Sequence, residues 1–85
     1  MKILLEKFMR VKKVEYLDNY RLKIVFSNNI SKIVDLKYYI QEKGLFAPLK
    51  DMAYFKNVSV DKDGITICWP NGADFSPEIL YEIGK

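Results

Sequence analysis

The sequence predicts a small α+β domain in which a mostly antiparallel sheet packs against two short helices. Apolar and charged residues alternate over positions 20–26, a pattern typical of a half-buried strand. Turn-forming Asn, Asp and Gly residues separate further strand-like segments, and Ser-Pro-Glu at 76–78 has the composition of a helix start. Since strands outnumber helices and short turns join them, we expect the order β-β-β-α-β-β-α in one domain over residues 1–85.

Three antiparallel strands are expected in the first third of the chain. Val11–Leu17 is followed by Asp18-Asn19, a pair that tolerates the positive φ of a tight hairpin turn. Tyr20–Phe26 is the second strand, and Asn28-Asn29 provides another turn into Ile30–Val34. These segments predict a three-stranded meander.

A short helix is expected after the meander. Asp35 has the side chain of a helix cap, and Leu36, Tyr39 and Ile40 fall on one helical face. Gly44 stands where this helix of about two turns is expected to end.

An apolar connector and a second helical turn follow. Pro48 is expected to keep Leu45–Leu49 from continuing as helix. Asp51 then caps a brief turn through Met52–Phe55, whose aromatic residues we expect at one edge of the core.

A second hairpin and a final helix complete the chain. Asn57–Val60 and Ile65–Trp69 flank the turn residues 61–64, with Ile65, Ile67 and Trp69 on one face and Thr66 and Cys68 on the other. Ser76 is the expected cap of the last helix, Pro77 its first residue, and Ile79, Leu80 and Ile83 its buried stripe. We expect the five strands to form one sheet.

Composition favours a binding domain over an enzyme with an enclosed site. The 85 residues are 49% hydrophobic, enough for one core but not for a deep cavity as well. The sequence contains no His, the commonest acid–base group and metal ligand at neutral pH. Asp61–Gly64 lacks the further ligands of a calcium loop and is expected to be a hairpin turn. We expect no catalytic residues, no metal and no cofactor.

The sequence also bears on location. Cys68 is the only cysteine, so no intramolecular disulfide can form, and the cytoplasm is the expected compartment. Without a His partner Cys68 is expected to be an ordinary packed thiol. The apolar run in Met1–Lys13 is interrupted by Glu6 and Lys7, so we expect neither a signal peptide nor a membrane span.

An ordered set of short motifs over residues 10–82 resembles the bacterial family catalogued as domain of unknown function 2442. The motifs are Val11-x-x-Val14, Leu22-x-Ile24-x-Phe26, Val34-Asp35-Leu36, Leu49-x-Asp51, Phe55-x-x-Val58-x-Val60-Asp61 and Trp69-Pro70-Asn71-Gly72-x-Asp74-x-Ser76-Pro77. Asn29 stands where such proteins often have Gly, and Asn also tolerates positive φ. The resemblance implies a small α+β domain without an established activity, and a place in toxin–antitoxin-like gene pairs for some members.

Trp69, Asn71 and Asp74 are the candidate residues for contact with a protein partner. Trp69 continues the face of Ile65 and Ile67, so it is expected in the core, and it becomes a contact candidate only if it is exposed, as does Tyr81. Asp74 either braces the turn at Asn71 or contacts a partner.

A second candidate surface is basic. It consists of Arg10, Lys12, Lys13, Arg21 and Lys23, on adjacent strands and with Tyr16 or Tyr20 interleaved. Residues 1–13 carry five basic residues against one acidic, whereas residues 60–85 carry two basic against five acidic. Phosphate binding and an ordinary solvated sheet face both explain such charges.

The sequence therefore predicts a non-enzymatic, cytoplasmic protein-binding module that uses an exposed sheet edge, or the Trp69–Asp74 turn with the last helix. It is hypothesised to be the antitoxin-like or regulatory member of a two-gene pair. The alternative is an accessory nucleic-acid binder, and a third hypothesis is an enzyme built on Asp35 and Asp74. Self-association through a sheet edge remains open.

Overall fold

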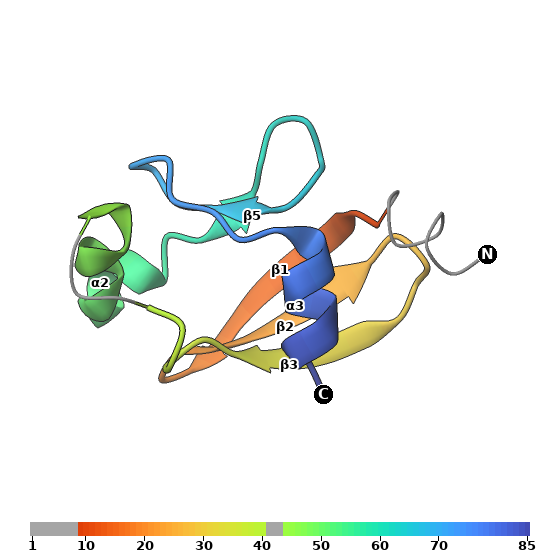
Figure 1. The fold of residues 1–85 in the computed structure, drawn as a ribbon, viewed down its shortest axis with the longest axis horizontal. Coiled ribbons are helices and arrows are strands. Elements are labelled where there is room, and N and C mark those ends of the chain that lie inside the picture. The colour runs from red at the N-terminus through yellow and green to blue at the C-terminus, as the bar shows by residue number, and fades with distance from the viewer. Residues whose placement is uncertain (1–8, 41–43) are drawn as a thin grey trace.

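The computed structural model describes residues 9–40 and 44–85 and has the predicted α+β architecture (Figure 1). The elements in chain order are the strands β1 (Val11–Asp18), β2 (Arg21–Phe26) and β3 (Ser31–Asp35), the 3₁₀ helix η1 (Gly44–Lys50), α2 (Met52–Phe55), β4 (Ser59–Val60), β5 (Ile67–Cys68) and α3 (Pro77–Ile83). The order β-β-β-α-β-β-α is confirmed.

The meander forms as expected, with β2 between β1 and β3 in an antiparallel sheet. Leu22, Ile24 and Phe26 are fully buried, whereas Lys23 between them is exposed. The alternation in β2 therefore gives the sheet one face toward the core and one toward solvent.

Both turns of the β1-β2-β3 meander contain an Asn with positive φ. Asn29 (φ 70°) lies in the second turn, as predicted. The first turn is shifted by one residue, because Asp18 pairs with Arg21 and leaves Asn19 (φ 48°) and Tyr20 as the connecting pair. An irregularity of the register between Tyr16 and Asp18 accompanies this shift.

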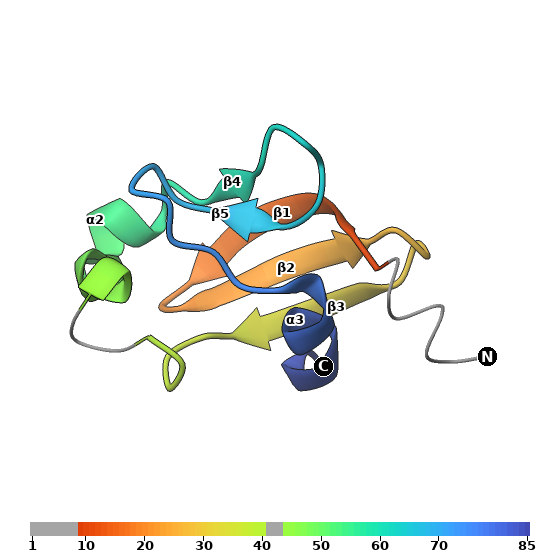
Figure 2. The same cartoon turned by 45° about the horizontal axis from the view of Figure 1, so that its top comes forward.

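The second hairpin does not join the first sheet, so the prediction of one sheet is wrong. β4 and β5 pair only with each other, through Ser59–Cys68 and Val60–Ile67. Figure 2 shows this hairpin alongside β1. One backbone hydrogen bond, 3.0 Å from the Val11 nitrogen to the Ile65 oxygen, connects the two. A register irregularity in the β1–β2 ladder follows Val11 at this edge.

The predicted face of the last strand is also partly wrong. Ile67 and Trp69 are buried, but Ile65 is 39% exposed and Thr66 is buried in its place. The Ile65 nitrogen donates to the Asp61 carboxylate at 2.9 Å, so Ile65 still belongs to the turn and the alternation begins only after it.

The helix predicted from Asp35 to Gly44 is absent from its described part, and residues 41–43 lie outside the described residues. Asp35 ends β3, and its carboxylate accepts a 3.0 Å hydrogen bond from the Lys37 nitrogen. This bond starts a turn over residues 37–39 in place of a helix. Leu36 and Ile40 are buried, whereas Tyr39 is 45% exposed.

The apolar connector is helical, contrary to the prediction. η1 begins at Gly44, whose φ of 71° is the left-handed conformation expected of a helix end, and contains Pro48. A 3₁₀ segment is a common connector between other elements.

The short helix α2 and the last helix α3 begin as predicted. The Asp51 carboxylate accepts from the Ala53 nitrogen, and the Ser76 hydroxyl accepts from the Ile79 nitrogen, with Pro77 in the first turn. In α3, Leu80 is fully buried, but Ile79 is 46% exposed and does not belong to the buried stripe.

The core lies between the inner face of the β1-β2-β3 sheet and the C-terminal half of the chain. Its buried side chains are Val11, Leu22, Ile24, Phe26, Val34, Leu36, Ile40, Leu49, Phe55, Ile67, Trp69, Ala73 and Leu80. Helix α3 contacts β3, so it covers the inner face near that edge of the sheet (Figures 1 and 2). No helix of residues 9–40 and 44–85 covers the opposite face, which we call the outer face.

Gly84 lets the end of α3 approach β3. A Cβ built on Gly84 would lie 2.9 Å from the Lys32 Cβ and 3.0 Å from the Leu80 carbonyl oxygen. We expect Gly84→Ala to lower the free energy of unfolding by about 1–3 kcal/mol, because backbone or strand must shift. Urea unfolding measures this, with the exposed Glu82→Ala as control, expected within about 0.5 kcal/mol of wild type. Equal stability of the two variants would contradict the close packing.

Candidate interaction surface

Trp69 is a core residue, so the condition for its role as a partner contact is not met. It is 2% exposed, and its indole nitrogen donates to the Phe55 carbonyl oxygen at 2.9 Å. Its ring lies 5.6 Å from that of Phe55 and 6.0 Å from that of Phe75. Tyr81 is half-buried, at 4.9 Å from Phe26.

Asn71, and not Asp74, braces the turn after Trp69. The Asn71 oxygen accepts from the Ala73 nitrogen at 3.1 Å, and its amide donates to the Leu45 carbonyl oxygen at 2.8 Å. The Asp74 backbone forms a bridge to Cys68, while its side chain is exposed and hydrogen-bonds to no other described residue. Of the three predicted contact residues, only Asp74 is exposed at the surface.

The five predicted basic residues do not form one basic face. The outer face of the sheet carries Lys13, Glu15, Arg21, Lys23, Val25, Ser31, Ile33 and Asp35. Glu15 stands directly opposite Lys23, and Asp35 opposite Arg21. Acidic residues therefore compensate the basic ones on this face, as on an ordinary solvated sheet.

Arg21 is further compensated by Asp18. Its guanidinium donates two hydrogen bonds to that carboxylate, at 2.7 and 3.0 Å. The hydrogen bond from Arg21 lowers the pKa of Asp18 below its usual value. Arg21 is already paired before any ligand arrives.

Within the described strands, no aromatic side chain lies on the outer face. Tyr16 pairs in register with Leu22, which is buried, so its side chain is directed to the inner face. The rings of Tyr16 and Tyr20 lie 6.2 and 5.2 Å from the ring of Phe55. The predicted interleaving of tyrosines with basic residues is therefore wrong, and the outer face has no described ring on which a nucleic-acid base would stack.

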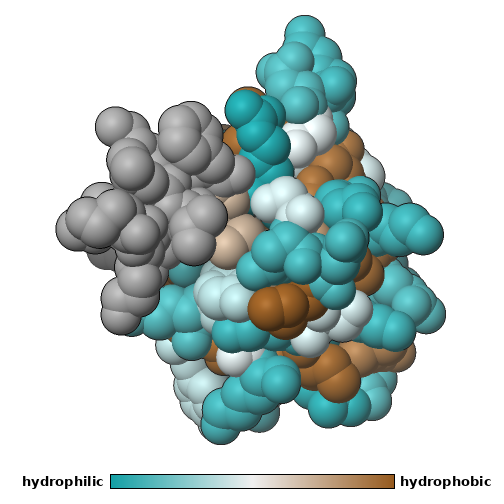
Figure 3. Space-filling view, turned by 90° about the vertical axis from the view of Figure 1, so that its right-hand side faces the viewer, coloured by the Kyte–Doolittle hydropathy of each residue, from teal (hydrophilic) through white to brown (hydrophobic). Residues whose placement is uncertain are grey.

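Arg10, Lys12 and Lys13 are exposed near the β2–β3 turn, and we call them the basic end. The Arg10 nitrogen donates to the Ser27 hydroxyl, and the Lys12 ammonium to the Asn29 side chain at 2.7 Å. Figure 3 views the molecule from the side of this turn, where hydrophilic surface predominates and the hydrophobic patches are small and separate.

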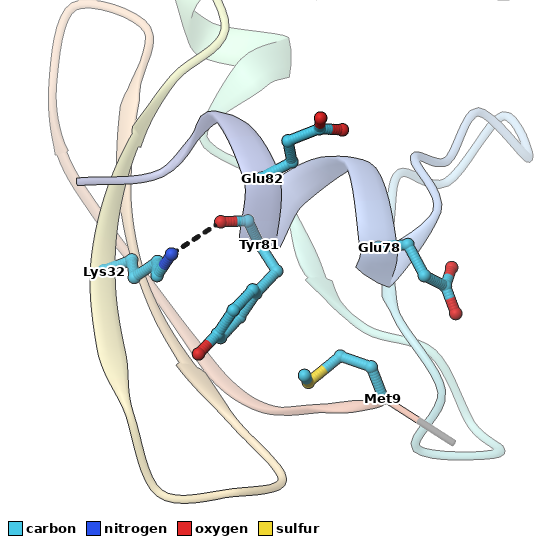
Figure 4. A pocket seen from close by; sticks show the side chains of 5 residues that line it. All are labelled: Met9, Lys32, Glu78, Tyr81 and Glu82. Atoms are coloured by element: carbon cyan, nitrogen blue, oxygen red, sulfur yellow. Dashed lines mark hydrogen bonds between the residues drawn. The ribbon is translucent and has the colours of Figure 1, made fainter. Parts of the chain in front are cut away.

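Asp35 lies at the end of β3 and Asp74 beside β5, and only Asp35 lines one of the three hollows described in this section. In the hollow below α3, Glu78 and Glu82 point away from each other, while Lys32 donates to the Tyr81 carbonyl oxygen at 2.7 Å (Figure 4). No group of three or more His, Cys, Asp or Glu side chains suited to a metal occurs within residues 9–40 and 44–85.

Two adjoining hollows follow the outer face and the edge of β3, and the sequence analysis missed them. One, of about 580 Å³, is lined by Arg21, Ile33, Asp35, Tyr39, Ile83 and Lys85. The other, of about 340 Å³, is lined by Leu17, Lys23, Ser31, Lys32, Ile33 and Lys85. They share Ile33 and Lys85, so we treat them as one groove and call it the β3 groove.

The β3 groove is lined by apolar and by basic side chains; we call the apolar ones its floor and the basic ones its rim. Ile33 and Tyr39 are 42% and 45% exposed, and Leu17 and Ile83 are half-buried. The sequence contained one signal for this groove, since Leu17 and Ile33 are apolar residues in positions that the strand alternation directs to solvent. Tyr39 comes from the turn after β3 and Ile83 from the end of α3, so their contributions depend on the tertiary fold.

Comparisons with known proteins agree with the fold. The model of the family described as "Protein of unknown function (DUF2442)" matches residues 11–85. The crystal structure of "Putative DNA Binding Protein NE0471" from Nitrosomonas europaea matches with a TM-score of 0.78 and 24% identity, over 92% of this chain and 50% of that one. The chain thus spans about half of that protein, and the likeness shows the fold alone. No curated protein matches.

No helix among the described residues is long and apolar enough to cross a membrane.

Proposed function

Because the chain belongs to the DUF2442 family, whose function is unknown, we propose its function from its surface: it binds another protein through the β3 groove. The observation that carries the proposal is the apolar floor of that groove, which is exposed between the outer face of β3 and the end of α3, where no further described element covers it. Exposed apolar surface rimmed by polar side chains is typical of sites of protein association. This supports the predicted use of a sheet edge and not of the Trp69–Asp74 turn.

The proposed role is a non-enzymatic one in the cytoplasm. The single cysteine supports that compartment, and the lack of His gives the groove no ready acid–base group. A small binding module of this kind fits the antitoxin-like or regulatory member of a two-gene pair, in which one small protein covers a surface of another. Affinity capture from native lysate, with and without nuclease, tests whether a protein binds.

Ile33→Glu is expected to reduce capture of a protein partner at least tenfold, because it places a carboxylate on the apolar floor of the groove. Ile30→Glu is a matched control, since Ile30 is 43% exposed against 42% for Ile33 but lines neither hollow. Mass spectrometry of the captured proteins measures both. Equal capture by wild type and Ile33→Glu would contradict the proposed site.

Nucleic-acid binding is the second candidate function, favoured by the basic end and by the name of the structurally similar Nitrosomonas europaea protein. It would require Arg10, Lys12 and Lys13 to contact phosphates. The logarithm of the affinity for duplex DNA would then fall with the logarithm of salt concentration with a slope of about −2.7 for three contacts. Replacing all three residues with Glu is expected to abolish such binding, as measured by fluorescence anisotropy, while circular dichroism stays unchanged. Retained binding would exclude the basic end.

A further inference from the structure

We infer that the β3 groove takes its partner as an added β-strand, an extended segment with alternating apolar and acidic side chains that pairs with the edge of β3. The inference rests on the proposed function and adds how the partner is bound and of what chemistry it is. Strand addition is an established mode of peptide recognition, in which backbone hydrogen bonds supply affinity and side chains supply specificity.

The peptide groups that face away from β2 can be assigned from the hydrogen bonds at the two ends of the ladder. The Leu36 nitrogen donates to the Tyr20 oxygen at 2.9 Å, and the Phe26 nitrogen donates to the Ile30 oxygen at 2.9 Å. In an antiparallel pair the direction of these groups alternates along the strand. The peptide groups of Lys32 and Val34 therefore face β2. The peptide groups of Ser31, Ile33 and Asp35 are directed to the open edge.

One backbone hydrogen bond already reaches this edge. The Lys85 nitrogen donates to the Ile33 carbonyl oxygen at 2.9 Å, which confirms that the Ile33 peptide group is directed away from β2. Among the described residues no other backbone group bonds to the open edge of Ser31, Ile33 or Asp35. An incoming segment would form further backbone hydrogen bonds with the peptide groups of this edge, of which Lys85 contacts one.

The side chains around the edge define the chemistry of the segment. Ile33, Tyr39 and Ile83 would contact apolar side chains of the added strand. The rim carries four basic residues against the single carboxylate of Asp35, namely Arg21, Lys23, Lys32 and Lys85. Arg21 is paired with Asp18, and Lys32 donates to the Tyr81 carbonyl oxygen. Glu15 stands opposite Lys23, but among the described residues neither Lys23 nor Lys85 forms an ion pair, so both ammonium groups can bind acidic side chains of the segment. Acidic side chains on the added strand would therefore complement the charge of the rim.

The opposite edge of the sheet is less suited to strand addition. β4 packs beside β1, and the Ile65 oxygen accepts the hydrogen bond of the Val11 nitrogen there. The register irregularities in β1 also interrupt its edge, whereas the β2–β3 register is continuous from Arg21–Asp35 to Val25–Ser31. An added strand needs such an uninterrupted edge.

The test titrates the ¹⁵N-labelled full chain with the peptide acetyl-Glu-Val-Glu-Val-Glu-Val-Glu-amide. We expect the largest amide shifts at Ser31, Ile33, Asp35 and Lys85. The same peptide with methylated backbone nitrogens, and a version with Lys in place of Glu, are expected to bind at least tenfold more weakly. No binding, shifts elsewhere, or equal affinity of the methylated peptide would overturn the inference.

Capture of a protein from lysate separates this inference from the proposed function. Ser31→Pro removes one N–H from the open edge and is expected to weaken both peptide and partner binding. If Ile33→Glu abolishes capture while Ser31→Pro and backbone methylation change nothing, the groove binds protein by its side chains and only the inference fails. If Ile33→Glu changes nothing, the proposed function fails. If sedimentation shows a dimer and Ser31→Pro dissociates it, the added strand belongs to a second copy of this chain and the inference of a different partner fails.

Discussion

Replacing Trp69 with alanine is expected to lower the free energy of unfolding by about 3–5 kcal/mol. Trp69 is 2% exposed and its ring contacts Phe55 and Phe75, so truncation leaves a large cavity among aromatic rings. It also removes the donor to the Phe55 carbonyl oxygen. Since small domains have a total stability of roughly 5–15 kcal/mol, much of it would be lost.

Urea unfolding followed by circular dichroism measures this effect. Tyr38→Ala is the control, because Tyr38 is 84% exposed and its removal is expected to change the free energy by less than about 0.5 kcal/mol. Trp69→Phe is expected to fall between them, since it keeps an aromatic ring but leaves the Phe55 oxygen without its donor. A stable Trp69→Ala variant would mean that the aromatic cluster is not part of the core.

The buried position of Trp69 shows that a motif typical of a family need not be a binding site. The Trp-Pro-Asn-Gly-x-Asp segment is the most specific part of the family resemblance, and the structure uses most of it for folding. Trp69 fills the core, and both polar atoms of the Asn71 side chain hold neighbouring backbone groups. Only Asp74 of the predicted contact set is left exposed.

The parts of the fold that the sequence predicted depend on local signals. The alternation in β2, Asn29 in its turn, and the caps Asp51 and Ser76 each act within a few residues, so a short window of sequence contains the relevant physics. The α+β class followed from these elements together.

The errors arose where tertiary contacts decided between alternatives. Asp35 has a side chain suited to a helix cap or to a turn, and pairing of β3 with β2 selected the turn. β4 and β5 pair only with each other, and whether such a hairpin extends a neighbouring sheet depends on contacts between segments that are far apart in the sequence. The β3 groove combines residues from β1, β2, β3, α3 and the segment after β3, and so its shape could not be predicted from periodicity.

Lys32→Pro and Ser31→Pro are expected to differ strongly in stability, although the two residues are neighbours in β3. The Lys32 peptide group faces β2, so proline at this position removes the N–H that donates to β2 and leaves the acceptor there without its hydrogen bond. The proline ring would also lie against β2. Relative to Lys32→Ala, which accounts for the lost contacts with Tyr81, we expect a further loss of about 3 kcal/mol. Thermal and urea unfolding measure this difference.

Ser31→Pro, compared with Ser31→Ala, is expected to lose less than about 1 kcal/mol, because the Ser31 nitrogen is directed to the open edge and proline is tolerated on edge strands. The contrast between positions 31 and 32 tests the assignment of the open edge without any ligand. Equal losses at both positions, or a larger loss at 31, would mean that the peptide groups alternate in the opposite phase. The groups available to an added strand would then be those of Lys32 and Val34, whose side chains face the core side of the sheet, and the β3 groove would have no edge to offer on its exposed face.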